Sequence, residues 1–580
     1  MQPTAEIKRL LAEDSDDADE DVHFSAGVEP LTTTRDFDSV LEAVGSLGRW
    51  HVRPVIVTCV FGIALSLQNV ATTFIAATPD HWCSAPALAH LDADECKNAS
   101  IPREMRDGEV AFARCSMYRG ALNDSDDRTV VPCQHGWSYD MPAGASTVVT
   151  DWDLVCRWEW LAAGVQSFYM FGFLVGCIIP SALSDRKGRR TTMMICIAVF
   201  CLSSILAAFA QSYKVFCFFR FLIGVSGGGA MNCTYVYALE NVGAPYRNRV
   251  SNTMHLIGIF GLLLLPVFSW LFPRWQHMQL AISIWVVICM SFYFLIPESP
   301  RWLYAEGRRE ECEQALRRIA RSNGTTYPEH VQLKLDRKKH LVKSPDGKVR
   351  EPSILDTVRT PNMRRKSLNL MFQWFTVSLV YYGLTLGSTG WTKNPYVGFT
   401  VNVLAEFPSV LLCAALLKYC GRRLALASTM LLAGGFCLLT AVPWLPLNEW
   451  ILPLLASLGK MFVAATFATV YIYSSELYPT VLRNVGLGSN SVLARIGAMA
   501  APYINLLGEH EKRLPLVLFS ALAVAASVVA MLLPETRDQL LPETLEDAEL
   551  FGRDQQLCQL YPPPPTQYSR HPGRAGKHEK

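Results

Sequence analysis

The chain has 580 residues, of which 18% are charged and 50% are hydrophobic, and its mean hydropathy is +0.19. Soluble domains usually carry about 25% charged residues, so this composition disfavours a purely soluble enzyme. The 53 basic and 51 acidic side chains leave a net charge of +2, which predicts no nucleic-acid partner.

The first 53 residues are polar and include an acidic run, EDSDDADED, at 13–21. They contain no basic segment followed by an apolar one, so we expect no cleaved signal peptide. Residues 37–50 place apolar side chains at helical intervals. This spacing predicts a short amphipathic helix against the membrane or the body of the protein, with a plain juxtamembrane spacer as the alternative.

Apolar stretches of about 20 residues recur along the rest of the chain. Each is long enough to cross about 30 Å of hydrocarbon as a helix. We therefore predict an all-α membrane protein with twelve spans, at 54–76, 160–182, 191–211, 215–239, 251–272, 277–296, 367–388, 396–417, 424–444, 449–473, 485–507 and 514–533.

The short loops on one side of these spans are richer in Lys and Arg than those on the other, which predicts that the first side is cytoplasmic. Both termini then lie inside, as the even number of spans requires. The predicted parts are an N-terminal tail with the short helix (1–53), a six-helix half (54–296), a cytoplasmic linker with helices (297–366), a second six-helix half (367–533) and a C-terminal tail (534–580).

The large loop at 77–159 is predicted to lie outside. An oxidising exterior favours disulfides, and the loop has an odd number of cysteines, so one thiol is left over or pairs elsewhere. Two sequons, at Asn98 and Asn123, are predicted glycosylation sites. The proline run at 562–565 in the tail could dock an SH3-type partner, although it also suits a flexible end. The loop cysteines are Cys83, Cys96, Cys115, Cys133 and Cys156.

The two predicted halves share three landmarks at matched depth. GRR occurs after the second and eighth spans, a glutamate followed seven residues later by arginine occurs after the fourth and tenth, and PES or PET ends the sixth and twelfth. Such a parallel repeat predicts a transporter with a site between its halves. The loop charges could pair across helix ends, stabilise an outward-open state and break when the halves rock; positive-inside topology alone is the alternative. These predicted switch residues are Asp185, Arg189, Arg190, Glu240, Arg247, Arg422, Arg423, Glu476 and Arg483.

These landmarks also carry a family resemblance. The chain resembles the major facilitator superfamily and, within it, the organic cation, anion and carnitine transporters of solute carrier family 22, from about Phe37 to about Asp547. The resemblance implies two pseudo-symmetric six-helix halves and a large disulfide-bearing outer loop after the first helix. The matching segments are STVVTDWDLVC (146–156), SDRKGRR (184–190), PESPRWL (297–303), ELYPTVLRN (476–484) and LPETLED (541–547).

Three ionisable residues lie deep in the predicted spans, where charge is costly and usually functional. They are Glu406, Lys460 and Arg495. They either form a site for a solute that carries both charges, or pair with one another for structural reasons. The resemblance implies substrate selectivity at Glu406 and Arg495, a combination that looks like the carnitine and ergothioneine subgroup.

Polar and aromatic residues of the seventh predicted span complete the expected substrate site. Trp374 and Tyr381 are seven residues apart, hence on one helix face, and could hold a quaternary ammonium by cation–π contact. Packing against neighbours is the alternative for any single ring. Gln373 is polar at membrane depth and is included, although such residues often serve interhelical hydrogen bonds.

The predicted function is alternating-access transport of a small organic ion, zwitterion or cation, across the plasma membrane. The chain has no GxxxxGK[ST] run, so we expect transport to be facilitative or coupled to Na⁺ or H⁺ and not driven by ATP. It also has no His-Cys cluster and no HExxH run at membrane depth, so we expect no enzymatic activity, no metal and no cofactor. The bilayer and the solute are the expected partners, and the oligomeric state is left open. The alternatives are an organic anion transporter of the same family, or a non-transporting receptor or scaffold.

Overall fold

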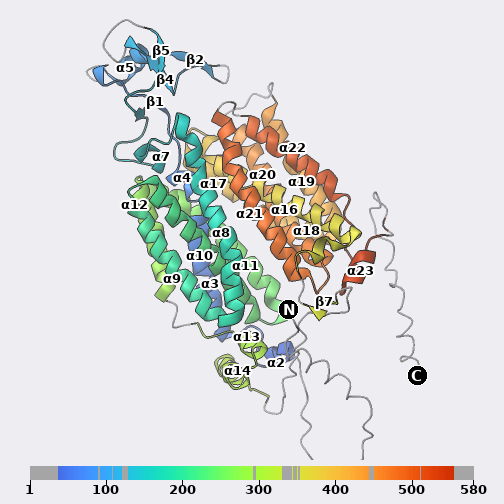
Figure 1. Ribbon diagram of the computed structural model, residues 1–580. Helices are drawn as coiled ribbons and strands as arrows, with labels where there is room; N and C mark the ends of the chain where they lie inside the picture. The colour runs from blue at the N-terminus through green and yellow to red at the C-terminus, as the bar shows by residue number, and fades with distance from the viewer. Residues whose placement is uncertain are drawn as a thin grey trace, which may run out of the picture.

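Two bundles of long helices and a small disulfide-bonded domain make up the protein (Figure 1). The computed structural model describes residues 37–88, 92–106, 109–120, 128–291, 296–328, 342–343, 349–350, 353–442, 450–509, 511, 513–553 and 555. Asn123 and the proline run at 562–565 lie outside the described residues.

The first bundle is the N-terminal half, drawn mainly in blue and green in Figure 1. A short helix, α4 (Thr72–Ile75), follows its first long helix, and a 3-10 turn (Ala244–Tyr246) precedes the fifth. Its long helices are α3 (Arg49–Asn69), α8 (Glu159–Lys187), α9 (Arg189–Ala208), α10 (Tyr213–Glu240), α11 (Arg247–Leu271) and α12 (Trp275–Ser291).

The second bundle is the C-terminal half, in yellow to red. Its second span is broken at Ala405 into two helices, so that Glu406 begins the second of them. Short 3-10 turns, Ser388–Gly390 and Leu507–Glu509, follow two of the helices. The helices are α16 (Pro361–Gly387), α17 (Pro395–Leu404), α18 (Glu406–Tyr419), α19 (Arg422–Ala441), α20 (Ile451–Leu477), α21 (Arg483–Leu506) and α22 (Leu514–Ala530).

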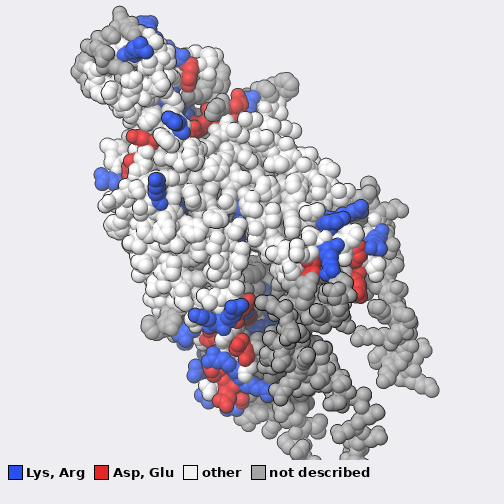
Figure 2. Space-filling model, viewed as in Figure 1, with Lys and Arg blue, Asp and Glu red and all other residues white. Residues whose placement is uncertain are grey.

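Each predicted span overlaps one or two helices of the described residues. Eight spans, counting α17 with α18 as one, are long and apolar enough by length and composition to cross a membrane. The other four are α12 and α22, with 17 described residues each, and α16 and α21, which bury several polar side chains. Charged side chains in Figure 2 gather at the two ends of the molecule, and the face between them is almost uncharged. This belt suits contact with lipid.

The loop domain (residues 77–158) consists of short antiparallel strand pairs and short helices. Its disulfides join Cys83 to Cys133 and Cys115 to Cys156, and Cys96 is the free thiol left among the five. β1 (His81–Cys83) pairs with β6 (Trp137–Tyr139), β2 (Arg103–Arg106) with β3 (Glu109–Phe112), and β4 (Ser116–Tyr118) with β5 (Val130–Pro132); the helices are η2 (Pro86–Leu88), α5 (Ala93–Ser100), α7 (Val148–Asp151) and η3 (Cys156–Trp158).

The loop domain marks one end of the bundle, called here the loop end. The opposite, linker end carries α2 (Phe37–Ala43), α13 (Pro300–Ala305) and α14 (Arg309–Asn323) under the N-terminal half, and α15 (Asp356–Arg359) and α23 (Leu545–Leu550) under the C-terminal half. Two short strands, β7 (Val342–Lys343) and β8 (Val349–Arg350), pair within the linker.

The helix predicted at 37–50 is shorter than expected. α2 ends at Ala43 because Gly45 adopts a φ of +100°, and α3 begins at Arg49, five residues before the predicted span. The apolar face of α2 packs against α13 and α14, where Val40 and Leu41 lie beside Trp302 and Leu316 in one cluster. Of the alternatives for this helix, the structure therefore has the one in which it lies against the body of the protein.

The two halves contact each other toward the loop end. There, α8 packs along α21, and α11 packs against α17. The Ser167 hydroxyl donates to the Met499 carbonyl at 2.8 Å, and the Asn69 amide donates to the Tyr382 hydroxyl at 3.2 Å. The halves therefore meet through α3, α8 and α11 on one side and α16, α17 and α21 on the other.

Candidate functional site

Glu406 and Lys460 form a buried ion pair within the C-terminal half. The Lys460 ammonium lies 2.9 Å from the Glu406 carboxylate, and both side chains are almost completely inaccessible to solvent. The break between α17 and α18 places Glu406 opposite the middle of α20, which carries Lys460. The sequence left two interpretations, a substrate site or a mutual structural pair. For Glu406 and Lys460, the structure has the mutual pair.

Three polar neighbours complete the coordination of this pair. The Tyr381 hydroxyl donates to the Glu406 carboxylate at 2.9 Å, and the Lys460 ammonium lies 4.1 Å from the centre of the Tyr381 ring. Lys460 also donates to the Thr385 hydroxyl and, at 3.2 Å, to the Asn402 amide oxygen. A buried pair with satisfied hydrogen bonds has little charge left for a solute.

Arg495 lies apart from this pair, on α21. Its side chain is buried, its guanidinium carbon lies 4.2 Å from the centre of the Phe173 ring, and its Nε has no hydrogen-bond partner. Among the described residues, no carboxylate pairs with it. Phe173 belongs to α8, so this stacking contact joins the two halves.

A second buried arginine, Arg220 on α10, also lacks an acidic partner among the described residues. It donates to the side-chain oxygen of Gln68 at 3.0 Å and to the Gln68 carbonyl at 3.4 Å, and it stacks over the Tyr169 ring at 4.7 Å. Lys460 and Glu406 cancel, so Arg220 and Arg495 leave two positive charges at this depth. Arg220 is visible in the sequence as a lone arginine in an apolar run, a pattern that indicates a buried charge with a structural or functional role.

The predicted aromatic residues lie in one cluster with two residues that sequence analysis did not select. The Trp374 and Tyr471 rings are 4.2 Å apart, and Phe467 contacts both Trp374 and Tyr381. The Trp374 indole nitrogen donates to the Ser474 hydroxyl at 2.9 Å, so its polar edge is already used inside the C-terminal half. Trp374 therefore packs within this aromatic cluster. Tyr381 contacts both the cluster and the Glu406–Lys460 pair.

Gln373 points away from this cluster. Its amide nitrogen donates to the Ala526 carbonyl of α22 at 2.8 Å and to Asn369 at 3.3 Å. The residue next to it, Trp374, faces α20 instead, because successive helical residues point about 100° apart. We therefore remove Gln373 from the substrate site and assign it to packing between α16 and α22.

The charges at the linker end form two matching networks, one in each half. In the first, Arg189 pairs with Asp185 and with Glu240, the latter at 3.1 Å. In the second, Arg422 pairs with Glu476 at 3.0 Å. These three pairs are among those predicted, and each joins residues of a single half.

Two glutamates that sequence analysis used only as landmarks hold these networks in place. Glu298 accepts the backbone N–H groups of Arg189 and Arg190, and Glu535 accepts those of Arg422 and Arg423, at 2.8–3.0 Å. Each carboxylate therefore caps the positive end of a helix dipole, of α9 or α19. In the sequence, Glu298 and Glu535 are the central residues of the PES and PET motifs, so the repeated motif marks the repeated cap.

Glycine is required beside both glutamates. Gly188 has a φ of +99° and Gly421 a φ of +83°, conformations that other residues rarely adopt. A Cβ atom at either position would also lie within 2.8 Å of the Glu298 or Glu535 carboxylate. The repeat seen in the sequence is thus a repeat of atomic contacts.

The remaining two predicted switch residues differ from expectation. Arg247 pairs with Asp38 of α2 at 2.9 Å instead of with Glu240, and Arg301 of α13 shares that carboxylate at 3.1 Å. Arg483 forms no ion pair with a described residue, and its Nε is buried without a partner. Arg247 therefore fastens the α2 segment to the N-terminal half.

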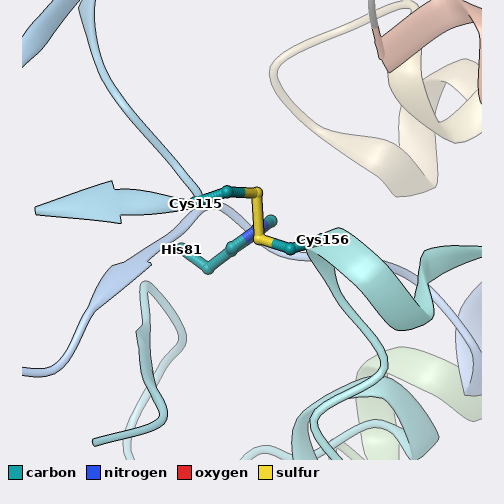
Figure 3. A group of neighbouring side chains, drawn as sticks. All are labelled: His81, Cys115 and Cys156. Atoms are coloured by element: carbon teal, nitrogen blue, oxygen red, sulfur yellow. A yellow bond between two sulfur atoms is a disulfide. The ribbon is translucent and has the colours of Figure 1, made fainter. Parts of the chain in front are cut away.

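A group of potential metal ligands lies in the loop domain, where His81, Cys115 and Cys156 are close together (Figure 3). Their ligand atoms are within 4.8 Å of one another, and burial lowers the pKa of His81. The two sulfur atoms are joined in a disulfide, so they are not the thiolates that zinc requires. While this bond is intact, the group is an imidazole packed on a disulfide.

The predicted glycosylation site at Asn98 lies on α5 and is exposed, with its side-chain oxygen accepting from Arg103 at 2.9 Å. Asn323, whose sequon is on the predicted cytoplasmic side, has a structural role. Its amide donates to the Val44 and Gly45 carbonyls and accepts from the Trp50 N–H at 3.1 Å. This side chain ties α14 to the start of α3.

Comparison with known proteins agrees with this architecture. The family described as "Sugar (and other) transporter" matches residues 138–547. Rat solute carrier family 22 member 3 is 34% identical over 547 residues, covering 90% of this chain and 96% of the relative. The chain belongs to solute carrier family 22, within the major facilitator superfamily. It is a multi-pass membrane transporter and not an enzyme.

A second relative within this family and one solved structure complete the comparison. Human organic cation/carnitine transporter 2 is 30% identical over 528 residues, covering 88% of this chain and 94% of the relative. The partially occluded inward-open structure of the *E. coli* xylose transporter XylE superimposes with a TM-score of 0.55 at 14% identity, covering 85% of this chain and 100% of the other. At that identity, the likeness concerns the fold alone.

Proposed function

We propose that this solute carrier transports small organic ions that bear a carboxylate, by alternating access across the plasma membrane, with Arg495 holding the carboxylate. The observation that carries the proposal is that one of the buried charged groups is paired with an opposite charge and another is not. Glu406 is neutralised by Lys460, whereas Arg495 is buried without an acidic partner among the described residues. An uncompensated buried cation favours an anionic ligand group.

The sequence predicted transport of an organic zwitterion or cation, with an organic anion as the alternative, and the proposal keeps only the solutes that bear a carboxylate. Zwitterions such as carnitine and organic anions both carry a carboxylate, and both remain within the proposal. A simple cation would need a free carboxylate, and Glu406 already accepts from Lys460 and Tyr381. The rings of Phe467 and Tyr471 provide faces for the ammonium group of a zwitterion.

Several parts of the proposal come from the sequence and stay predictions. The positive-inside pattern supports cytoplasmic termini, and the family supports the plasma membrane as the location. Coupling to Na⁺ or H⁺ also stays a prediction. Rocking of one half against the other is consistent with contacts that gather at the loop end and with charge networks that lie within single halves.

The test is a panel of labelled solutes with the wild type and Arg495→Gln. The panel contains carnitine, ergothioneine, an aromatic carboxylate and tetraethylammonium, each measured with and without sodium and normalised to surface protein. For every carboxylate that is carried, the methyl ester serves as the matched control in competition. We expect Arg495→Gln to weaken carboxylates about tenfold or more and to leave the esters unchanged.

Arg495→Asp extends the same test. Reversing the charge should shift selectivity from carboxylates toward tetraethylammonium, because the buried group then attracts cations. Equal losses for carboxylate and ester, or unchanged selectivity in a well-expressed variant, would overturn the assignment of Arg495.

A further inference from the structure

Tyr169 of α8 lies between the two uncompensated arginines. Its side chain is fully buried, and its hydroxyl has no hydrogen-bond partner among the described residues. Arg220 stacks on its ring, and Arg495 stacks on Phe173, one helical turn further along the same face of α8. Both arginines lie near enough to the Tyr169 hydroxyl for their charges to act on it.

Three other tyrosines that are equally inaccessible to solvent have protein partners. The Tyr237 hydroxyl donates to the Pro297 carbonyl at 3.0 Å, and the Tyr473 hydroxyl donates to the Pro534 carbonyl at 2.5 Å. The Tyr478 hydroxyl donates to the Asn490 side chain at 3.4 Å. Burial of an unpaired hydroxyl is unfavourable, so a phenylalanine would serve packing better than Tyr169 does.

The surroundings of the Tyr169 hydroxyl call for a negatively charged oxygen. The Nε atoms of Arg220 and Arg495 and the amide nitrogen of Gln68 are all buried donors without a partner in the described part of the chain. Donors therefore outnumber acceptors around this part of α8. A phenol in such a setting donates its proton to an acceptor, and a carboxylate accepts several such bonds at once.

We propose that the Tyr169 hydroxyl donates a hydrogen bond to the substrate carboxylate that Arg495 holds. This inference rests on the proposed function and adds a specificity residue from the N-terminal half. Arg495 belongs to α21 and Tyr169 to α8, so one carboxylate joins the two halves. Binding of the substrate then favours the arrangement in which α8 and α21 lie together.

The test is Tyr169→Phe, which removes one oxygen atom and keeps the ring on which Arg220 stacks. The probes are the carboxylate of the uptake panel that the wild type carries best and its methyl ester as competitor. We expect the KM for the carboxylate to rise about tenfold, with the inhibition constant of the ester unchanged. Tyr237→Phe is the matched control, because it removes an equally buried hydroxyl that bonds to backbone.

Binding to detergent-purified protein gives a second measurement that does not depend on delivery to the cell surface. The carboxylate should raise the Tm of the wild type and of Tyr237→Phe, and should raise that of Tyr169→Phe much less. A carboxylate effect of equal size in Tyr169→Phe and the wild type would overturn the role of Tyr169. If Arg495→Gln discriminates between carboxylate and ester but Tyr169→Phe does not, this inference fails alone; if neither does, the proposed function fails.

Discussion

Glu406 and Lys460 show how two charges inside a membrane can compensate each other and leave no net charge for a solute. Each charge alone would be costly at this depth, and together they cancel at 2.9 Å with three polar neighbours. Arg495 has no such acidic partner among the residues that the structure describes. The charge that a solute can meet therefore depends on which buried residues are paired with each other. The number of charged residues in the spans does not predict this charge.

Lys460→Gln should expose the charge of Glu406. Loss of one partner from a buried pair costs about 3–5 kcal/mol, so the Tm of the purified variant should fall clearly. The freed carboxylate should also allow uptake of tetraethylammonium, which the wild type should carry poorly. Surface-normalised uptake and thermal unfolding check these two expectations.

The double variant Glu406→Gln/Lys460→Gln is the control for this prediction. It removes both charges, so it should recover much of the lost Tm and gain no cation uptake. A Lys460→Gln variant with wild-type Tm and wild-type selectivity would show that the pair contributes neither stability nor selectivity.

At this scale, the sequence identified the charged residues at membrane depth but not how they pair. Glu406, Lys460 and Arg495 stood out because charge is rare in apolar spans. Their pairing depends on the break at Ala405 and on the packing of α18 against α20, which no local pattern encodes. Gln373 was misplaced for a similar reason, since its direction depends on how α16 is rotated about its axis.

At the scale of elements, the duplicated motifs build duplicated helix caps. Glu535 accepts four backbone N–H groups, from Arg422, Arg423, Thr536 and Arg537, while its own side chain is almost fully buried. The carboxylate thus joins the end of α22 to the start of α19. The sequence predicted the repeat and charge pairs across helix ends, but not the capping role of the two glutamates, because the sequence does not show which helix ends are neighbours.

Glu535→Gln should lower the stability of the C-terminal half. The variant loses the charge at the helix N-terminus and part of the bonding capacity, which together are worth about 1–2 kcal/mol. We expect a fall in Tm of a few degrees for purified protein. Glu543→Gln, an exposed position in the same tail, is the matched control and should leave the Tm unchanged. Equal Tm values for the two variants would contradict the capping role.

At the scale of the whole molecule, the loop domain is fastened to both halves. The Cys115–Cys156 disulfide joins its strands to η3, the turn that continues directly into α8 of the N-terminal half. Next to Cys115, Arg114 pairs with Glu509 in the turn after α21, in the C-terminal half, at 2.5 Å. The sequence predicted this loop and its cysteines, but a contact 395 residues away along the chain could only come from the fold.

Glu509→Arg should weaken closure of the loop end. The halves contact each other at this end, so opening toward the predicted exterior would separate Glu509 from Arg114. The pair is partly exposed and screened, so it should be worth about 0.2–1 kcal/mol, a factor of about 1.4–5 in the closed-to-open ratio. Charge reversal adds repulsion to this loss. Labelling of a cysteine introduced at Ser167, which bonds to Met499 across the halves, reports the opening and should become faster.

The swapped variant Arg114→Glu/Glu509→Arg decides whether the pair itself is responsible. It restores attraction between the loop domain and the C-terminal half while keeping the substituted residue at 509. We expect its labelling rate at position 167 to return toward that of the wild-type background. Asp80 also contacts Arg114, at 2.9 Å, and would repel a glutamate there, so Asp80→Asn is included in the swapped background. Labelling that stays fast in this triple variant would show that the disulfide and the apolar contacts hold the loop end closed without the ion pair.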